Sequence, residues 1–139
     1  MTRFLINTGD AINLIIKATK ISLGGEIFVV KMPAATNKTL MTVLIKKYGD
    51  SKTKISKIGI RPGEKMGEVL ISKNEAFFTK ELNHDLYVIL RQRDSQYLIE
   101  KYAKYKSVSF TEYTSRNTRI LNEVEVEKLL AQEGRNHKL

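Results

Sequence analysis

The chain has 139 residues, a formal net charge of +9 and no cysteine. Its length suits one domain, and its apolar and charged fractions are those of a globule rather than of a disordered chain. We expect no disulfide or thiolate metal site, no zinc centre from the distant His84 and His137, no membrane span, no signal peptide and a cytoplasmic location.

The first part of the chain predicts two helices with a strand between them. Apolar residues recur at helical spacing from Thr8 to Thr19. The compact β-branched run Glu26–Val30 is typical of a buried strand. After a turn, Thr36 or Thr39 is expected to cap a second helix, which Gly49 ends.

The rest of the chain continues this alternation. We predict a strand over Lys54–Ile60, a short helix through Glu68–Leu70 and another strand over Leu86–Leu90. Asn122, with Glu125 three residues later, indicates a capping box that opens the last helix. The alternation predicts an α/β or mixed α+β fold in one domain over residues 1–131, followed by a frayed tail over residues 132–139.

The segment Arg-Pro-Gly-Glu-Lys, residues 61–65, is placed at the corner between the predicted strand and helix. One interpretation is a solvated turn, because Pro and Gly mark turns in general and Glu64 can cap the turn. The other is an anion site, because helix starts favour anions and Arg61 offers a planar fork that grips a phosphate at two points. From the loop alone both interpretations stay open.

Other patterns are weaker. Tyr97–Lys101 and Tyr102–Lys106 match Tyr-x-x-x-Lys, but in a stretch rich in lysine and tyrosine we interpret both as chance matches on an exposed amphipathic helix. Gly59, Gly63 and Gly67 recur every four residues, which fits neither a dinucleotide fingerprint nor a phosphate-binding loop. Most of the positive charge comes from lysines scattered along the chain, with groups at residues 46–57 and 101–106. This charge allows an alternative function as a basic module that binds RNA or another polyanion, although no specific nucleic acid is indicated.

Four stretches occur in a family-specific order: MTRFLINTGDAINLIIKA, GGEIFVVKMPAAT, IGIRPGEKMGEVLIS and EYTSRNTRILNEVEVEKLL. Together they resemble the C-terminal part of the CapD/CapE-like polysaccharide biosynthesis enzymes. This family comprises UDP-N-acetylglucosamine 4,6-dehydratases and 5-epimerases and UDP-glucose 4-epimerase-like proteins of capsule, O-antigen and lipopolysaccharide synthesis. They are extended short-chain dehydrogenase/reductases.

The resemblance implies a division of labour. In the family an N-terminal Rossmann half binds NAD or NADP and carries the catalytic Tyr-x-x-x-Lys pair, while the C-terminal part holds the UDP-sugar. We expect this chain to be the UDP-sugar-binding part without the Rossmann half, hence without a cofactor site, a catalytic residue or activity of its own. Three origins fit this expectation: a truncated piece, the remnant of a split gene, or one half of a two-chain enzyme. The partner would then be the missing half or a second copy of this chain.

The resemblance also assigns substrate-binding residues. It places Arg61 on the diphosphate and Glu64 on the ribose hydroxyls of the uridine. Arg3 is expected near the phosphates or the sugar, with Thr2 beside it. Met32 and Pro33, in the loop that begins at Lys31, are expected to form a wall for the nucleotide. One departure is Gly67, where the family carries a large residue.

Overall fold

The strands of this domain are short and pair only antiparallel. The computed structural model describes residues 1–91 and 96–136. Its strands form three small sheets with the orders β1-β3, β2-β6-β5 and β4-β7. Their bounds are β1 Thr2–Phe4, β2 Ile27–Val30, β3 Ala34–Thr36, β4 Val69–Ile71, β5 Thr79–Glu81, β6 Leu86–Ile89 and β7 Tyr113–Thr114. The fold is thus a small mixed α/β domain built on antiparallel sheets.

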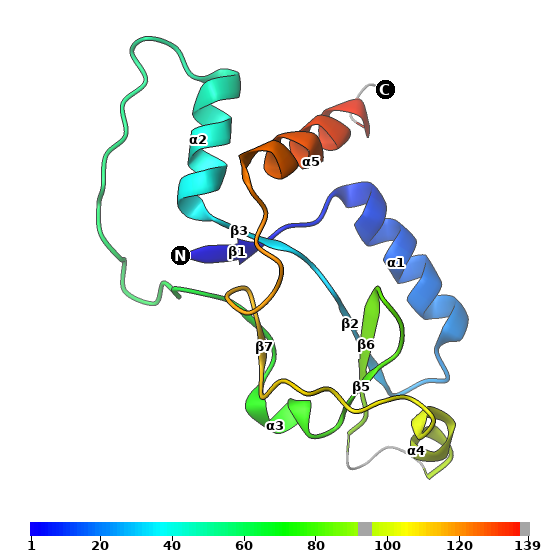
Figure 1. Cartoon of the computed structure of the whole chain (residues 1–139). Coiled ribbons are helices and arrows are strands. Elements are labelled where there is room, and N and C mark those ends of the chain that lie inside the picture. Colours follow the sequence, from blue (N-terminus) through cyan, green and yellow to red (C-terminus); the bar gives the residue numbers. More distant parts are fainter. Residues whose placement is uncertain (92–95, 137–139) are drawn as a thin grey trace.

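The helices surround these sheets (Figure 1). They are α1 Thr8–Ile21, α2 Asn37–Tyr48, α3 Lys73–Ala76, α4 Gln96–Tyr102 and α5 Glu123–Asn136. The side chain of Thr36 caps α2, and the predicted box of Asn122 and Glu125 caps α5 through reciprocal 3.0 Å hydrogen bonds. These bounds confirm the predictions of α1, β2, α2, β6 and the start of α5. The frayed tail was expected from residue 132, but α5 continues through Asn136; residues 137–139 lie outside the described part of the chain.

The predicted strand over Lys54–Ile60 is wrong. This segment has no regular structure and belongs to an exposed arm, residues 50–66, that swings away from α2 and returns beside β1 (Figure 1). The side chains of Ile55, Ile58 and Ile60 are 57%, 69% and 61% exposed. A strand forms only where a neighbour satisfies its backbone groups, and no described strand pairs with residues 54–60.

The predicted helix over Glu68–Leu70 is also wrong, since Val69–Ile71 forms β4. β-branched residues favour the extended backbone, and β7 pairs with this stretch. The helix begins later: Ser72 and Glu75 form a capping box that opens α3. Four further strands, β1, β3, β5 and β7, were not predicted, and β3 lies where a turn was expected.

The core consists of three groups of buried side chains. The first joins β2, β4, α3, β6 and β7, and the second joins β3, α2 and α5. The third places α4 against β6 through Leu98 and Tyr102. The exposed amphipathic helix expected over residues 97–106 thus ends at Tyr102 and buries two of its side chains.

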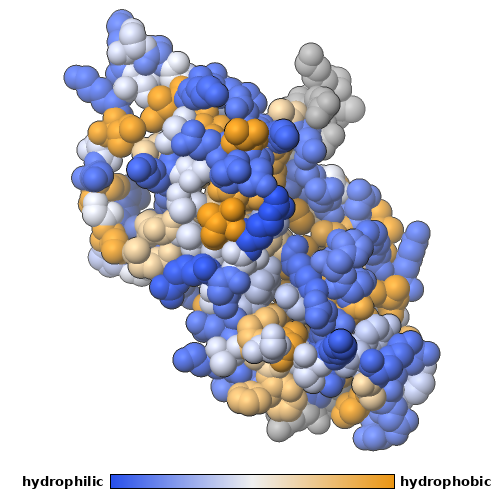
Figure 2. All heavy atoms as spheres, in the orientation of Figure 1, coloured by the Kyte–Doolittle hydropathy of each residue, from blue (hydrophilic) through white to orange (hydrophobic). Residues whose placement is uncertain are grey.

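Helix α1 contributes no buried side chain, although it is rich in isoleucine. Ile12, Ile15 and Ile16 are 51%, 66% and 48% exposed. On the face shown in Figure 2, apolar and hydrophilic side chains alternate without one dominant apolar area. The outer side of α1 is nevertheless an apolar helix face that the described residues leave uncovered.

Candidate functional site

Strand β1 brings the N-terminal residues onto the end of the arm. The backbone N–H of Thr2 donates to the Met66 carbonyl at 3.0 Å. Nη1 of Arg3 donates to the Lys65 carbonyl at 3.0 Å, and its Nε lies 3.3 Å from a carboxylate oxygen of Glu68. Two motifs that are sixty residues apart in sequence, the one around Arg3 and residues 61–65, therefore meet in space.

The residues 61–65 form a tight turn on the surface. The backbone N–H of Glu64 donates to the Arg61 carbonyl at 3.0 Å, and the Glu64 carboxylate accepts from the Arg61 backbone N–H at 3.1 Å. Gly63 has a φ of 81°, which L side chains rarely adopt. Glu64 thus caps the turn, as the first of the two interpretations predicted. The Arg61 guanidinium has no partner among the described residues and remains available for a ligand.

Ser115 connects β1 with the residue after Gly67, and its side chain is fully buried. Its hydroxyl lies 2.8 Å from that of Thr2 and 3.1 Å from the Thr2 carbonyl, to which it donates. It also accepts from the Glu68 backbone N–H at 2.9 Å, and the Ser115 backbone N–H donates to the Glu68 carbonyl. Thr2, Glu68 and Ser115 therefore hold β1, the end of the arm and β7 in one arrangement.

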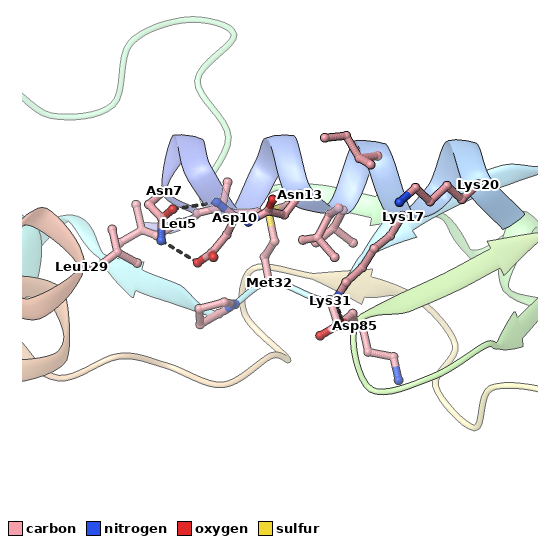
Figure 3. A pocket seen from close by; sticks show the side chains of 15 residues that line it. Leu5, Asn7, Asp10, Asn13, Lys17, Lys20, Lys31, Met32, Asp85 and Leu129 are labelled. Carbon is pink, nitrogen blue, oxygen red and sulfur yellow. Dashed lines mark hydrogen bonds and ion pairs between the residues drawn. The ribbon is translucent and has the colours of Figure 1, made fainter. Parts of the chain in front are cut away.

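Met32 and Pro33 precede β3, beyond the end of the β1-β3 pair, and do not lie at the turn of residues 61–65. The Pro33 carbonyl accepts from the Leu5 backbone N–H, beyond the pair of Phe4 and Ala34. Their loop separates two cavities. The larger, about 580 Å³, lies between this loop and α1, where Lys17 is paired with Asp85 at 3.0 Å (Figure 3).

The second cavity, about 470 Å³, lies on the other side of Met32 and has aromatic walls from Tyr87, Phe110 and Tyr113. The Tyr113 hydroxyl accepts from the Met32 backbone N–H and donates to the Met32 carbonyl, both at 2.9 Å. Lys31 lies over the Tyr87 ring and is paired with Glu81. Burial raises the pKa of Tyr87, so this phenol stays neutral. The polar groups here are largely paired with one another.

The two Tyr-x-x-x-Lys matches have ordinary structural roles. Tyr97 is 60% exposed on α4. Tyr102 is buried, its hydroxyl donates to Glu26 at 3.0 Å, and burial raises its pKa far above the usual range. Lys106 lies beyond the end of α4, so the second pair does not share a helix. A phenol held neutral in the core is unsuited to proton transfer at a substrate.

The described residues do not fit a dinucleotide. Gly59 and Gly63 have positive φ, but they lie in the exposed arm rather than between a strand and the helix that it feeds. A pyrophosphate loop needs that strand-turn-helix junction, because the helix N-terminus binds the phosphates. Among the described residues there is also no group of three or more histidine, aspartate or glutamate side chains that could hold a metal ion.

The residues that join the motifs were not singled out by sequence reasoning. Ser115, Arg116, Asn117 and Thr118 all belong to the stretch EYTSRNTRI, which contributed to the family resemblance without an assigned role. The available signal was their density of short polar side chains directly after a β-branched and aromatic run. Such residues form local side chain to backbone hydrogen bonds, which hold turns.

Comparisons with known proteins identify the family. Residues 1–92 match the model of a family described as polysaccharide biosynthesis protein. The chain belongs to this family. It is 38% identical over 133 residues to a UDP-glucose 4-epimerase of Rickettsia canadensis and 40% identical over 136 residues to that of Rickettsia akari. It is also 36% identical over 138 residues to an uncharacterized membrane protein of Methanocaldococcus jannaschii.

A solved structure of similar fold is described as the X-ray structure of Pen from Bacillus thuringiensis. The TM-score is 0.75 at 31% sequence identity, with 96% of this chain and 38% of that chain covered. The three curated relatives are likewise matched over 94% of this chain and 38% of their own length. This member of the polysaccharide biosynthesis family thus spans less than two-fifths of its relatives. No helix within residues 1–91 and 96–136 is long and apolar enough to cross a membrane.

Proposed function

We propose that residues 1–131 form the UDP-sugar-binding C-terminal part of an NAD- or NADP-dependent nucleotide-sugar epimerase or 4,6-dehydratase, of the extended short-chain dehydrogenase/reductase type. The enzyme would serve capsule, O-antigen or lipopolysaccharide synthesis. The family membership and the relatives named UDP-glucose 4-epimerase support a nucleotide-sugar substrate. The proposal concerns binding only, because we assign the catalytic pair to the Rossmann half.

The observation that carries the proposal is the contact between Arg3 and Lys65. It sets two guanidinium-bearing segments side by side at an exposed turn. Arg61 is free to pair with a phosphate, and such a charge-assisted bond contributes about 1.5–3 kcal/mol when it is shielded from water. The Glu64 carboxylate is an acceptor suited to the ribose diol, since a diol donates two hydrogen bonds. Its present bond to the Arg61 backbone holds it at the turn.

Met32 and Pro33 have a different place in this proposal. They line cavities beyond Phe4, so we assign them to the sugar side of the site rather than to the diphosphate. Thr2 has a positioning role, because its hydroxyl and backbone groups are already engaged by Ser115 and Met66.

Bound to the full-length enzyme, the nicotinamide would supply a hydride acceptor. The described residues contain no loop that fits it, so in this proposal the cofactor and the hydride chemistry belong to a separate Rossmann half. That half, or a second copy of this chain, is the partner that we expect to cover the uncovered face of α1.

The experiment is a titration of the chain with UDP, with uridine and with a single-stranded RNA of uniform sequence. A nucleotide clamp binds UDP more tightly than uridine, and Glu64→Ala weakens the binding of UDP. A general polyanion surface prefers the RNA, loses affinity steeply with salt and gains affinity when Glu64 is removed. Chemical-shift perturbation is suitable, because it detects millimolar affinities, which we expect if the Rossmann half contributes part of the pocket. A wild-type chain that shows no preference for UDP over uridine would overturn the proposal.

A further inference from the structure

The side chain of Arg116 lies directly over Gly67. A Cβ atom built on Gly67 would come within 3.0 Å of Cγ, 3.1 Å of Nε and 3.2 Å of Cδ of Arg116. Gly67 follows Met66 and precedes Glu68, and both of these neighbours contact β1. The Arg116 side chain is therefore packed against the same short stretch, residues 65–68, that receives Arg3.

The backbone that carries Arg116 is held firmly. The Asn117 side chain accepts from the Thr114 backbone N–H at 2.7 Å, and the Arg116 backbone N–H donates to the Thr114 hydroxyl at 3.2 Å. Ser115, the preceding residue, is fully buried. A side chain that leaves such a turn loses little further backbone freedom when it binds a ligand.

Arg3, Arg61 and Arg116, which lie on β1, on the arm and on the turn after β7, differ in whether their guanidinium groups are paired. Arg3 is paired with Glu68. Arg61 is unpaired, but it lies on the exposed arm. Arg116 is exposed at its tip, and within the described part of the chain its guanidinium has neither an ion-pair nor a hydrogen-bond partner. Of the three arginines, only Arg116 has both a backbone held by hydrogen bonds and a guanidinium without a partner among the described residues.

We propose that Arg116 binds a phosphate of the nucleotide diphosphate, and that Gly67, which has no Cβ, allows its side chain to lie close against the loop. This proposal rests on the proposed function and names a binding residue for the same site. The planar guanidinium, lying along the loop at Gly67, offers two parallel N–H donors to a phosphate. Arg3, neutralised by Glu68, then acts as a support of the loop.

The test is a double-mutant cycle on the chain with Arg116→Ala, Gly67→Ala and the double variant, titrated with UDP and with uridine. Arg116→Ala should weaken UDP binding about tenfold or more, which is the loss of one charge-assisted bond, and change uridine binding less than about twofold. Gly67→Ala should weaken UDP binding too, because its Cβ displaces Arg116. The double variant should be no weaker than Arg116→Ala, since residues that act through one interaction are not additive.

Two controls keep the result specific. Arg116→Lys keeps the positive charge but loses the planar guanidinium, so it should retain part of the UDP affinity. Lys104→Ala removes one positive charge beyond α4 and should leave the UDP affinity unchanged. Circular dichroism of each variant checks folding.

Two results would overturn this inference: unchanged UDP affinity in a folded Arg116→Ala variant, or additive losses of affinity in the cycle. If Arg61→Ala still weakens UDP binding, the proposed nucleotide site stands without Arg116. A wild-type chain that does not bind UDP would overturn both proposals.

Discussion

The hydroxyl of Ser115 lies 2.8 Å from the hydroxyl of Thr2, although 113 positions separate the two residues in the sequence. The same Ser115 oxygen accepts a hydrogen bond from the backbone of Glu68. One buried side chain therefore joins β1, the end of the arm and the turn that carries Arg116. This junction fixes how these three segments lie relative to one another.

Removing this hydroxyl should destabilise the fold. In Ser115→Ala the Thr2 hydroxyl and the Glu68 N–H lose a partner in a buried place, which should lower the free energy of unfolding by about 1–3 kcal/mol. Urea denaturation measures the change. Ser107→Ala is the matched control, because Ser107 is exposed and, among the described residues, its hydroxyl accepts a hydrogen bond only from the Lys80 ammonium. Its effect on the free energy of unfolding should stay within about 0.5 kcal/mol. Equal effects of the two substitutions would contradict the role of Ser115.

Arg61 and Glu64 should affect two ligands differently. Arg61→Ala should weaken UDP binding more than uridine binding, because the lost partner is a phosphate charge. Glu64→Ala should weaken both to a similar degree, because the ribose is common to them and because the turn loses its cap. Parallel titrations of UDP and uridine give the ratio. Equal losses for both ligands in Arg61→Ala would remove the diphosphate assignment.

The chain alone should neither bind a nicotinamide dinucleotide measurably nor convert a UDP-sugar. The physical reason is that the glycines of the arm do not open a helix and that Tyr102 is a buried, neutral phenol. Calorimetric titration with the oxidised and reduced cofactor, together with an assay on UDP-glucose and UDP-N-acetylglucosamine, tests this. Turnover by the purified chain would return the exposed Tyr97 and Lys101 to consideration.

The uncovered face of α1 should cause association of the isolated chain. Ile12, Ile15 and Ile16 form an apolar stripe that water disfavours, so the apparent mass should rise with concentration. Ile15→Glu should shift the chain toward monomer, whereas Asn13→Glu, which adds the same charge on the other side of the helix, should not. Light scattering over a range of concentrations measures the mass. A monomeric wild-type chain with a concentration-independent unfolding transition would count against this face as an interface.

The capping box of α3 should make stability depend on acid. Hydrogen bonds from the Ser72 side chain and backbone lower the pKa of Glu75 below its usual 4.5. Ionised Glu75 therefore stabilises the folded state above that value, and the stabilisation is lost as the pH falls through the lowered pKa.

Glu75→Gln should thus be less stable than wild type by about 1 kcal/mol near neutral pH, with the difference shrinking below about pH 4. Urea midpoints at several pH values measure it, and Glu112→Gln provides a control in which the carboxyl has no side-chain partner among the described residues. A Glu75→Gln difference that does not change with pH would be the contrary result.

Local patterns were sufficient for the elements whose stabilisation is local. The helical spacing before Thr19, the β-branched run at Ile27–Val30 and the capping box at Asn122 predict α1, β2 and α5 because each pattern reports on neighbours within a few residues. The same reasoning failed at Lys54–Ile60, where the alternation of isoleucines resembles a strand but no neighbour pairs with it. It failed again at Val69–Ile71, where pairing with the distant β7 overrides the expected helix.

By itself, the sequence determined the family, through four ordered stretches, and the chemical character of Arg61 and Glu64. Only the tertiary structure decided that Arg3 contacts Lys65, that Ser115 joins Thr2 to Glu68, and that Arg116 lies over Gly67. Each of these contacts joins residues about fifty or more positions apart, and short-range periodicity carries no information about such pairs. They form because burying the polar junction around Ser115 requires every donor and acceptor to find a partner, which only one arrangement of the three segments provides.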